Sequence, residues 1–147
     1  AEIENFVRIG SSIGGYVVFP STRVNGLNSI NQERGINPLI CDRFDLTLEC
    51  IRRGFANEES PLSAVIRANW SFFELFKDFK GYVNFFLLQD LVIKNYSAVK
   101  YLLPTQELFS SSPLPRSIEE YRIYQNASES YVLNRNARIV EWCTAAR

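Results

Sequence analysis

The segment that begins at Ser60 and Pro61 constrains the fold more than any other part of the chain, because its apolar side chains recur at helical spacing. Ser60 followed by Pro61 is typical of a helix start, with an N-cap residue and then a proline at the first helical position. From there one apolar stripe is formed by Leu62, Val65, Ile66, Asn69, Phe73 and Phe76. A helix with such a stripe must bury it against a second apolar surface, so the chain is expected to pack helices on one another.

Residues 38–54 predict the helix that covers this stripe. At about 100° per residue, the charged side chains gather on one side of that helix, and the opposite face carries Ile40, Phe44, Leu48, Ile51 and Phe55. We expect the stripe of residues 62–76 to pack on the apolar face of residues 40–55, because these two segments have the widest apolar faces in the chain.

Two short stretches predict β-strands. Residues 15–20, "GYVVFP", are β-branched and aromatic and end at a proline, and residues 98–103, "AVKYLL", end before Pro104. We expect the second stretch to pair with the first. Elsewhere in the first part of the chain, a short helix is expected over residues 2–10 and a turn-rich loop from Ser21 to Asn37.

The second half of the chain predicts mostly helix. Gly81 is expected to break or bend the helix that starts at Ser60, and residues 82–91 form either a buried helix, which we favour, or a buried strand. Ser117 and Glu120 predict a capping box at the start of a long C-terminal helix. The inward side of that helix is expected to carry Ile118, Tyr121, Tyr124, Tyr131, Ile139 and Trp142.

The predicted fold class is therefore α+β and predominantly α-helical. Helices pack around one core, together with a small two-stranded β element. With 147 residues, 46% of them hydrophobic, the chain is expected to form a single globular domain over residues 1–147.

Charge and residue usage exclude several classes of function. The 16 Lys and Arg residues balance 16 Asp and Glu residues, so binding of nucleic acid is not expected. No apolar run approaches the roughly 20 residues that span a membrane. The chain has no histidine, which excludes Ser-His, Cys-His and zinc-hydrolase mechanisms within it. Its three cysteines, an odd number, are expected to be free thiols, which indicates a reducing compartment and a cytoplasmic protein.

The charged side of the helix predicted at 38–54 is the first part of a candidate site. Its carboxylates Asp42, Asp45 and Glu49 are spaced so that their oxygens can bind one divalent cation such as Mg²⁺, or act as general acid and base. Arg52 and Arg53 follow at the end of the same helix and are counted as ligand-binding residues. We therefore assign the three carboxylates as candidate catalytic residues, while the metal and the reaction stay open.

The loop "SINQERG" just upstream is the second part of the candidate site. Asn31 and Arg34 are suited to hold a phosphate or carboxylate group, and Gly35 is expected to permit an unusual backbone turn. We expect Asp45 to lie at the centre of one polar cluster, with Asp42 and Glu49 on either side and Arg34 close by. The function predicted from this cluster is the binding of an anionic small molecule or a metal–anion pair.

The alternative function is that of a non-enzymatic protein-interaction component, which binds a protein partner or forms a homo-oligomer. In that case the same charges serve only as internal ion pairs, which are common in amphipathic helices. The location of the charges separates the two hypotheses. A pocket that contains Arg34 and Asp45 side by side favours ligand binding, and dispersal of these groups favours the interaction protein.

Several sequence blocks together resemble a bacterial family known only as a domain of unknown function. These blocks are "INQERG", "DRFDLTLECIRR", "FKGYVNFFLLQDLV", "VKYLLP" and the late "RNARI", and they extend through most of the chain. The resemblance implies a bacterial cytosolic protein and no established activity, cofactor or site. It also implies members that extend further upstream, so that an N-terminal portion is missing here and apolar residues near Phe6 and Tyr16 are left exposed or covered by a partner.

Overall fold

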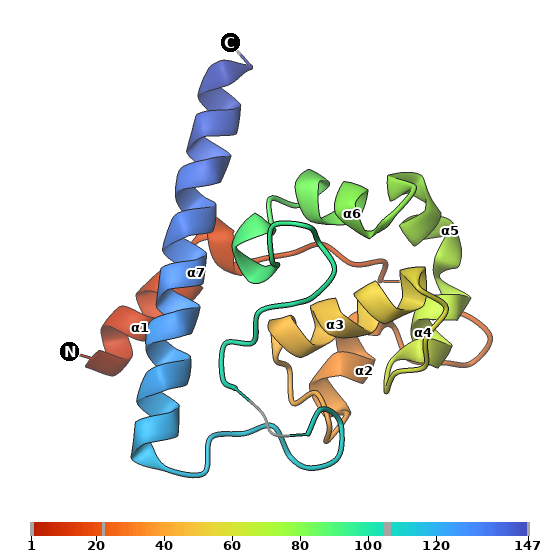
Figure 1. Cartoon of the computed structure of the whole chain (residues 1–147), viewed down its shortest axis with the longest axis horizontal. Helices are drawn as coiled ribbons and strands as arrows, with labels where there is room; N and C mark the ends of the chain where they lie inside the picture. Colours follow the sequence, from red (N-terminus) through yellow and green to blue (C-terminus); the bar gives the residue numbers. More distant parts are fainter. Residues whose placement is uncertain (1, 22, 105–106, 147) are drawn as a thin grey trace.

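The computed structural model describes residues 2–21, 23–104 and 107–146, and within these it is built from helices joined by irregular segments (Figure 1). In chain order the elements are α1 (Glu2–Gly10), η1 (Ile13–Gly15), α2 (Ile30–Ile36), α3 (Phe44–Phe55), α4 (Ser63–Ala68), α5 (Trp70–Phe73), η2 (Glu74–Phe76), α6 (Phe79–Phe85), η3 (Gln89–Leu91) and α7 (Ile118–Ala145). Helices α2 to α6 form a body, and the long helix α7 runs along one side of it with α1 (Figure 1). No helix in the described ranges is long and apolar enough to cross a membrane.

The predicted two-stranded β element is wrong. The described residues contain no strand, and their only β-type pairing is one isolated antiparallel bridge between Val92 and Val99. Backbone groups that strand pairing would need are hydrogen-bonded to side chains instead. The carbonyl of Tyr16 accepts a hydrogen bond from Arg135, and the N–H of Leu102 donates to Asp45. The two predicted strands are therefore irregular segments fixed in part by side chains, and the fold class is helical.

Helix α2 replaces the second part of the predicted loop of residues 21–37, of which residue 22 lies outside the described residues. Ser29 begins the helix with a capping box, because its side chain accepts from the N–H of Gln32 and the Gln32 side chain accepts from the N–H of Ser29. Gly35 lies within this helix, so the expected unusual turn at Gly35 is also wrong. In the described chain the glycine with positive φ is Gly26, at 74°.

Helix α3 begins at Phe44, later than the predicted start at residue 38. Residues 38–42 form turns in which Cys41 and Asp42 adopt left-handed backbone conformations, with φ of 48° and 62°. The predicted packing of the two apolar stripes is confirmed, because Leu48 and Phe73 are fully buried and the ring of Phe55 lies edge-on to that of Phe73, with a centroid distance of 6.3 Å.

The predicted helix of residues 62–76 is divided into α4, α5 and η2. Asn69 lies at the junction of α4 and α5, where its side-chain amide donates to the carbonyl of Val65 at 2.8 Å. Gly81 does not end this helix; it lies in the first turn of α6, where a Cβ would come within 2.0 Å of the carbonyl oxygen of Phe76. Residues 82–91 are helical in part, with the end of α6 and then η3.

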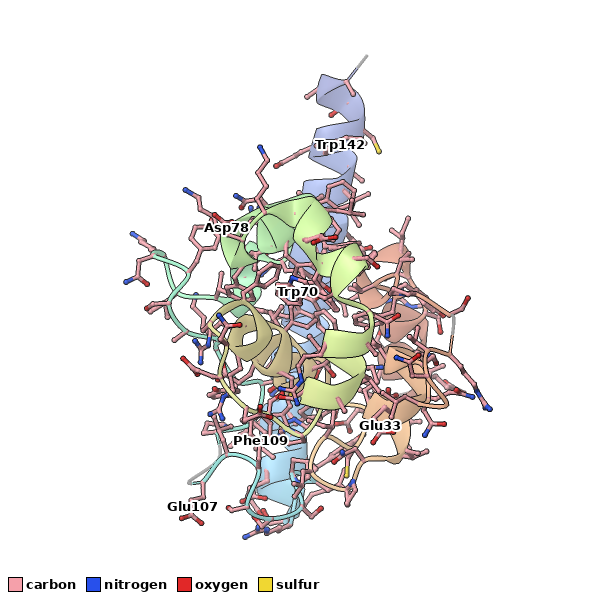
Figure 2. The ribbon with its side chains drawn as sticks, turned by 90° about the vertical axis from the view of Figure 1, so that its right-hand side faces the viewer. Glu33, Trp70, Asp78, Glu107, Phe109 and Trp142 are labelled. Carbon is pink, nitrogen blue, oxygen red and sulfur yellow. The ribbon has the colours of Figure 1, made fainter. Side chains whose placement is uncertain are left out.

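Helix α7 starts where the sequence predicted, with the Ser117 side chain accepting from the N–H of Glu120. The return half of the capping box is absent from the described bonds, because the Glu120 carboxylate accepts from the N–H of Arg116 instead. Tyr131 is buried as expected. Ile118 and Trp142 are exposed, since Ile118 lies in the first turn and Trp142 lies where α7 extends beyond the body (Figures 1 and 2).

Arg135 fixes α7 to the rest of the chain. Its buried guanidinium donates to the carbonyls of Gly14, Tyr16 and Phe86 at 2.6–2.9 Å. One turn further along, Arg138 forms an ion pair with Asp90. Beyond this point residues 140–146 are all exposed, so the last turns of α7 have no packing partner among the described residues.

Candidate functional site

The charged side chains around α3 form three separate groups rather than one cluster. In the first group, Arg34 of α2 binds the turn before α3. Its guanidinium forms an ion pair with the Asp42 carboxylate, donates to the Asp42 carbonyl at 2.7 Å and donates to the Thr47 hydroxyl at 3.1 Å. Burial lowers the pKa of Arg34, while the Asp42 carboxylate opposes this shift. The Asp42 side chain itself is 71% exposed, and Asn31 lies exposed on α2.

The second group is a buried ion pair between Arg43 and Asp45 at the N-terminus of α3. The guanidinium of Arg43 donates to both carboxylate oxygens of Asp45, and it also donates to the carbonyls of Leu103 and Pro113 at 3.1 and 2.8 Å. The carboxylate additionally accepts from the N–H of Leu102 at 2.8 Å. These bonds use both carboxylate oxygens of Asp45 and four of the five N–H groups of Arg43, and all of the partners belong to the same chain.

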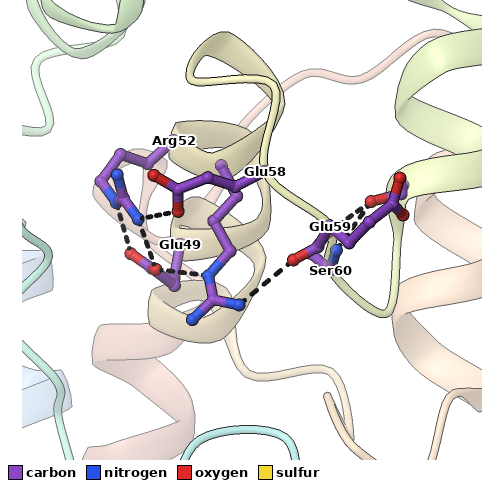
Figure 3. Close-up of polar contacts among 7 residues, drawn as sticks. Glu49, Arg52, Glu58, Glu59 and Ser60 are labelled. Carbon is purple, nitrogen blue, oxygen red and sulfur yellow. Dashed lines mark hydrogen bonds and ion pairs between the residues drawn. The ribbon is translucent and has the colours of Figure 1, made fainter.

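The third group lies at the C-terminal end of α3 (Figure 3). Glu49 accepts hydrogen bonds from Arg52 at 2.9 and 3.0 Å and from Arg53 at 2.8 Å. Arg52 also donates to Glu58, and Arg53 donates to the carbonyl of Glu59. The hydrogen bond with Glu49 raises the pKa of Arg52. The group holds the loop after α3 against the helix.

The predicted site residues thus lie around the same helix, α3, but they form separate groups with different partners. Asp45 has an arginine within hydrogen-bonding distance, as expected, but that residue is Arg43, and Arg34 binds Asp42 instead. The sequence signal for Arg43 was its position two residues before Asp45: Arg43 is the N-cap residue of α3, and Asp45 lies in the first turn. In the described ranges, no group of three or more His, Cys, Asp or Glu side chains is arranged to hold a metal ion.

Two hollows lie near α3. A hollow of about 650 Å³ lies beside the start of α3, and its polar lining includes Glu107, Arg116 and Glu120. A smaller hollow of about 290 Å³ lies beside the end of α3, lined by Trp70, Arg67 and other residues of α4 and its flanks. Neither lining includes any of the predicted catalytic or ligand-binding residues.

A further surface, which sequence reasoning missed, lies on the outer side of α7. We call it the outer stripe. Its members are uncharged, recur at alternating spacings of three and four residues and are all exposed: Ile123, Asn126, Ser130, Leu133, Ala137 and Val140. Such spacing places them along one face of a helix. The spacing is present in the sequence, but the tyrosines on another face of the same helix give a stronger apolar pattern.

The comparisons with known proteins give one match. The model of a family of unknown function, DUF6994, matches residues 1–139. No curated protein and no solved structure matches this chain.

Proposed function

This chain belongs to the DUF6994 family of unknown function, and we propose that it is a non-enzymatic protein-interaction component that binds a partner through the outer stripe of α7. The stripe is the observation that carries the proposal. Three of its apolar members are more than half exposed: Ile123 at 51%, Leu133 at 51% and Val140 at 62%. Aligned apolar side chains on an exposed helix are typical of a surface that packs against another helix.

The state of the charged groups supports the same proposal. Each of the carboxylates Asp42, Asp45 and Glu49 is paired with an arginine of its own chain. Arg34 and Asp45 bind different partners, which is the dispersal expected of an interaction protein. In this proposal the charges connect α2, α3 and the segments around them, and they bind neither metal nor substrate.

The proposed setting is the cytoplasm of a bacterium. The three cysteines are free, as expected for a reducing compartment, with Cys50 buried in the core. Burial raises the pKa of the Cys50 thiol to about 11, so this thiol stays protonated and unreactive at neutral pH.

Photo-crosslinking in the cells that make the protein tests the proposal. A photo-reactive amino acid replaces Leu133 in one variant and Trp142 in another. Trp142 is a matched control because it is exposed on the same helix, about 180° around the axis from Leu133 at about 100° per residue. We expect a discrete crosslinked protein from position 133 and none from position 142. Equal products from both positions, or none from position 133, would contradict the proposal.

The competing hypothesis of an anion or metal site is tested by thermal unfolding of the purified chain. If Asp45 or Arg34 bound such a ligand, Mg²⁺, Mn²⁺ or inorganic phosphate would raise the melting temperature, by an amount set by its concentration relative to its Kd. We expect no shift with any of the three. A concentration-dependent increase that Asp45→Asn or Arg34→Met abolishes would establish the ligand site instead.

A further inference from the structure

We propose that the surface formed by η2, α6 and the loop of residues 92–100 binds to a membrane surface that carries anionic lipids. This surface, which we call the lysine face, is separate from the outer stripe of α7. The chain has only four lysines, and all of them lie exposed on this face: Lys77, Lys80, Lys94 and Lys100. A lysine-rich surface is attracted to the negative potential of anionic lipids.

The charges of the lysine face are available to a partner. Within the described ranges none of the four ammonium groups forms an ion pair, whereas six arginines are paired with carboxylates of the chain. Three carboxylates lie among the lysines, those of Glu74, Asp78 and Asp90, and Asp90 is paired with Arg138. The four lysines and Arg138 outnumber these carboxylates, so the face is net positive. Because the whole chain has a net charge of 0, the rest of the molecule is net negative, and this favours one orientation on a charged surface.

Contacts between α6 and the loop place lysines of the two segments side by side. The ammonium of Lys80 lies 5.5 Å from the centroid of the Tyr96 ring, and the Tyr96 hydroxyl donates to the side chain of Asn84 at 2.9 Å. Lys94 lies two residues before Tyr96 in the same loop. At the end of the loop, the N–H of Lys100 donates to the carbonyl of Leu91 at 2.7 Å. The cations therefore form a continuous surface rather than isolated charges.

Exposed apolar side chains lie between the lysines. Leu75 is 72% exposed, Phe85 69% and Ile93 38%. The ring of Phe85 lies 5.1 Å from that of Phe76, which places it beside the turn that carries Leu75. At a membrane, such side chains enter the boundary between headgroups and acyl chains, while lysine ammonium groups stay at the phosphates. A nucleic acid would also bind the lysines but would leave these apolar groups in water, so the combination favours a membrane.

A strained turn holds one end of the lysine face outward. Lys77 has φ of 68° and ψ of −50°, and the N–H of Asp78 donates to the carbonyl of Phe76 at 2.8 Å. Lys77 is therefore the central residue of a γ-turn with positive φ, which is a rare and strained conformation. Strain of this kind is concentrated at sites where the position of a side chain matters for binding. Here the turn leaves both Leu75 and Lys77 exposed.

Co-sedimentation of the purified full chain with lipid vesicles tests the proposal. We expect binding to vesicles of phosphatidylcholine and phosphatidylglycerol in equal parts, no binding to vesicles of phosphatidylcholine alone, and release at high salt. Lys80→Gln combined with Lys94→Gln should raise the Kd for the mixed vesicles at least about tenfold. The matched control combines Arg8→Gln with Arg122→Gln, which removes the same charge from exposed positions on α1 and α7 and should leave this Kd nearly unchanged.

Leu75→Ala tests the apolar part of the contact. It should weaken binding to the mixed vesicles several-fold and leave the salt dependence of binding as in the wild type, because it removes apolar area and no charge. No binding of the wild type to the mixed vesicles, or equal weakening by the lysine and arginine variants, would overturn the proposal. Unchanged binding by Leu75→Ala would also overturn it. Binding to single-stranded RNA without binding to vesicles would assign the lysine face to nucleic acid instead.

Discussion

Arg43 and Asp45 form an ion pair that is almost completely enclosed, with side-chain exposures of 2% and 0%. The pair connects the start of α3 to the segment that leads into α7, because Arg43 donates to the carbonyl of Pro113 and Asp45 accepts from the N–H of Leu102. The other two charged groups of the α3 region also join separate segments: Arg34 connects α2 to the turn before α3, and Arg52 and Arg53 connect the end of α3 to the loop that follows it.

Replacing Asp45 tests the structural role of this pair. Asp45→Asn leaves the Arg43 guanidinium buried without its counter-charge, so we expect a loss of about 3–5 kcal/mol in the free energy of unfolding, measured by urea denaturation. Asp42→Asn is the matched control, since the Asp42 carboxylate is largely exposed and its loss should cost less than about 1 kcal/mol. Similar effects of the two substitutions would show that burial of the Arg43–Asp45 pair contributes little.

Leu48 tests the packing of the two apolar stripes. It is fully buried on α3. Leu48→Ala should therefore lower the free energy of unfolding by about 2–5 kcal/mol, through lost apolar burial and the cavity left behind. Leu75→Ala, at an exposed leucine of η2, should change it by less than about 0.5 kcal/mol in the same denaturation experiment. A small effect at Leu48 would be incompatible with the observed core.

Replacing two glycines with alanine should change the stability of the protein in opposite directions. At Gly14 a Cβ would lie 2.4 Å from the carbonyl oxygen of Val132 on α7, so Gly14→Ala should push η1 away from α7 and destabilise the protein by about 1–3 kcal/mol. At Gly35, inside α2, a Cβ would meet nothing within 4 Å, so Gly35→Ala should stabilise by about 0.5–1 kcal/mol. Melting temperatures that shift in the same direction would contradict these two environments.

The ion pair between Asp90 and Arg138 makes stability depend on pH. The hydrogen bond from Arg138 lowers the pKa of Asp90 in the folded chain. Its contribution is therefore complete above the unfolded pKa of about 3.9 and is lost as the pH falls through the folded pKa. Asp90→Asn should cost about 1 kcal/mol or less at pH 7, because the pair is partly exposed, and the difference from wild type should vanish in acid. In an Arg138→Met background, Asp90→Asn should change the free energy of unfolding by the same small amount at pH 7 and in acid.

The sequence by itself determined the elements that depend on local signals. The cap at Ser117 predicted the start of α7, and the apolar spacing of Leu48 and Phe73 predicted which two segments pack together. These predictions were correct because capping and apolar periodicity act within a few residues or through the hydrophobic effect, which is not directional. The free cysteines followed from composition in the same way. The outer stripe was not predicted: its spacing is present in the sequence, but the packing of α7 decided that this face stays exposed.

The tertiary structure decided where each polar group finds its partner. The sequence placed Asp45 with Arg34, but Asp45 pairs with Arg43, because the left-handed turn at Cys41 and Asp42 starts α3 at Phe44 and directs Asp42 to Arg34. Likewise, the carbonyl of Tyr16 and the N–H of Leu102 bind Arg135 and Asp45 rather than a neighbouring strand. A hydrogen bond depends on distances of tenths of an ångström and on direction, and these are set only when segments far apart in the sequence come together.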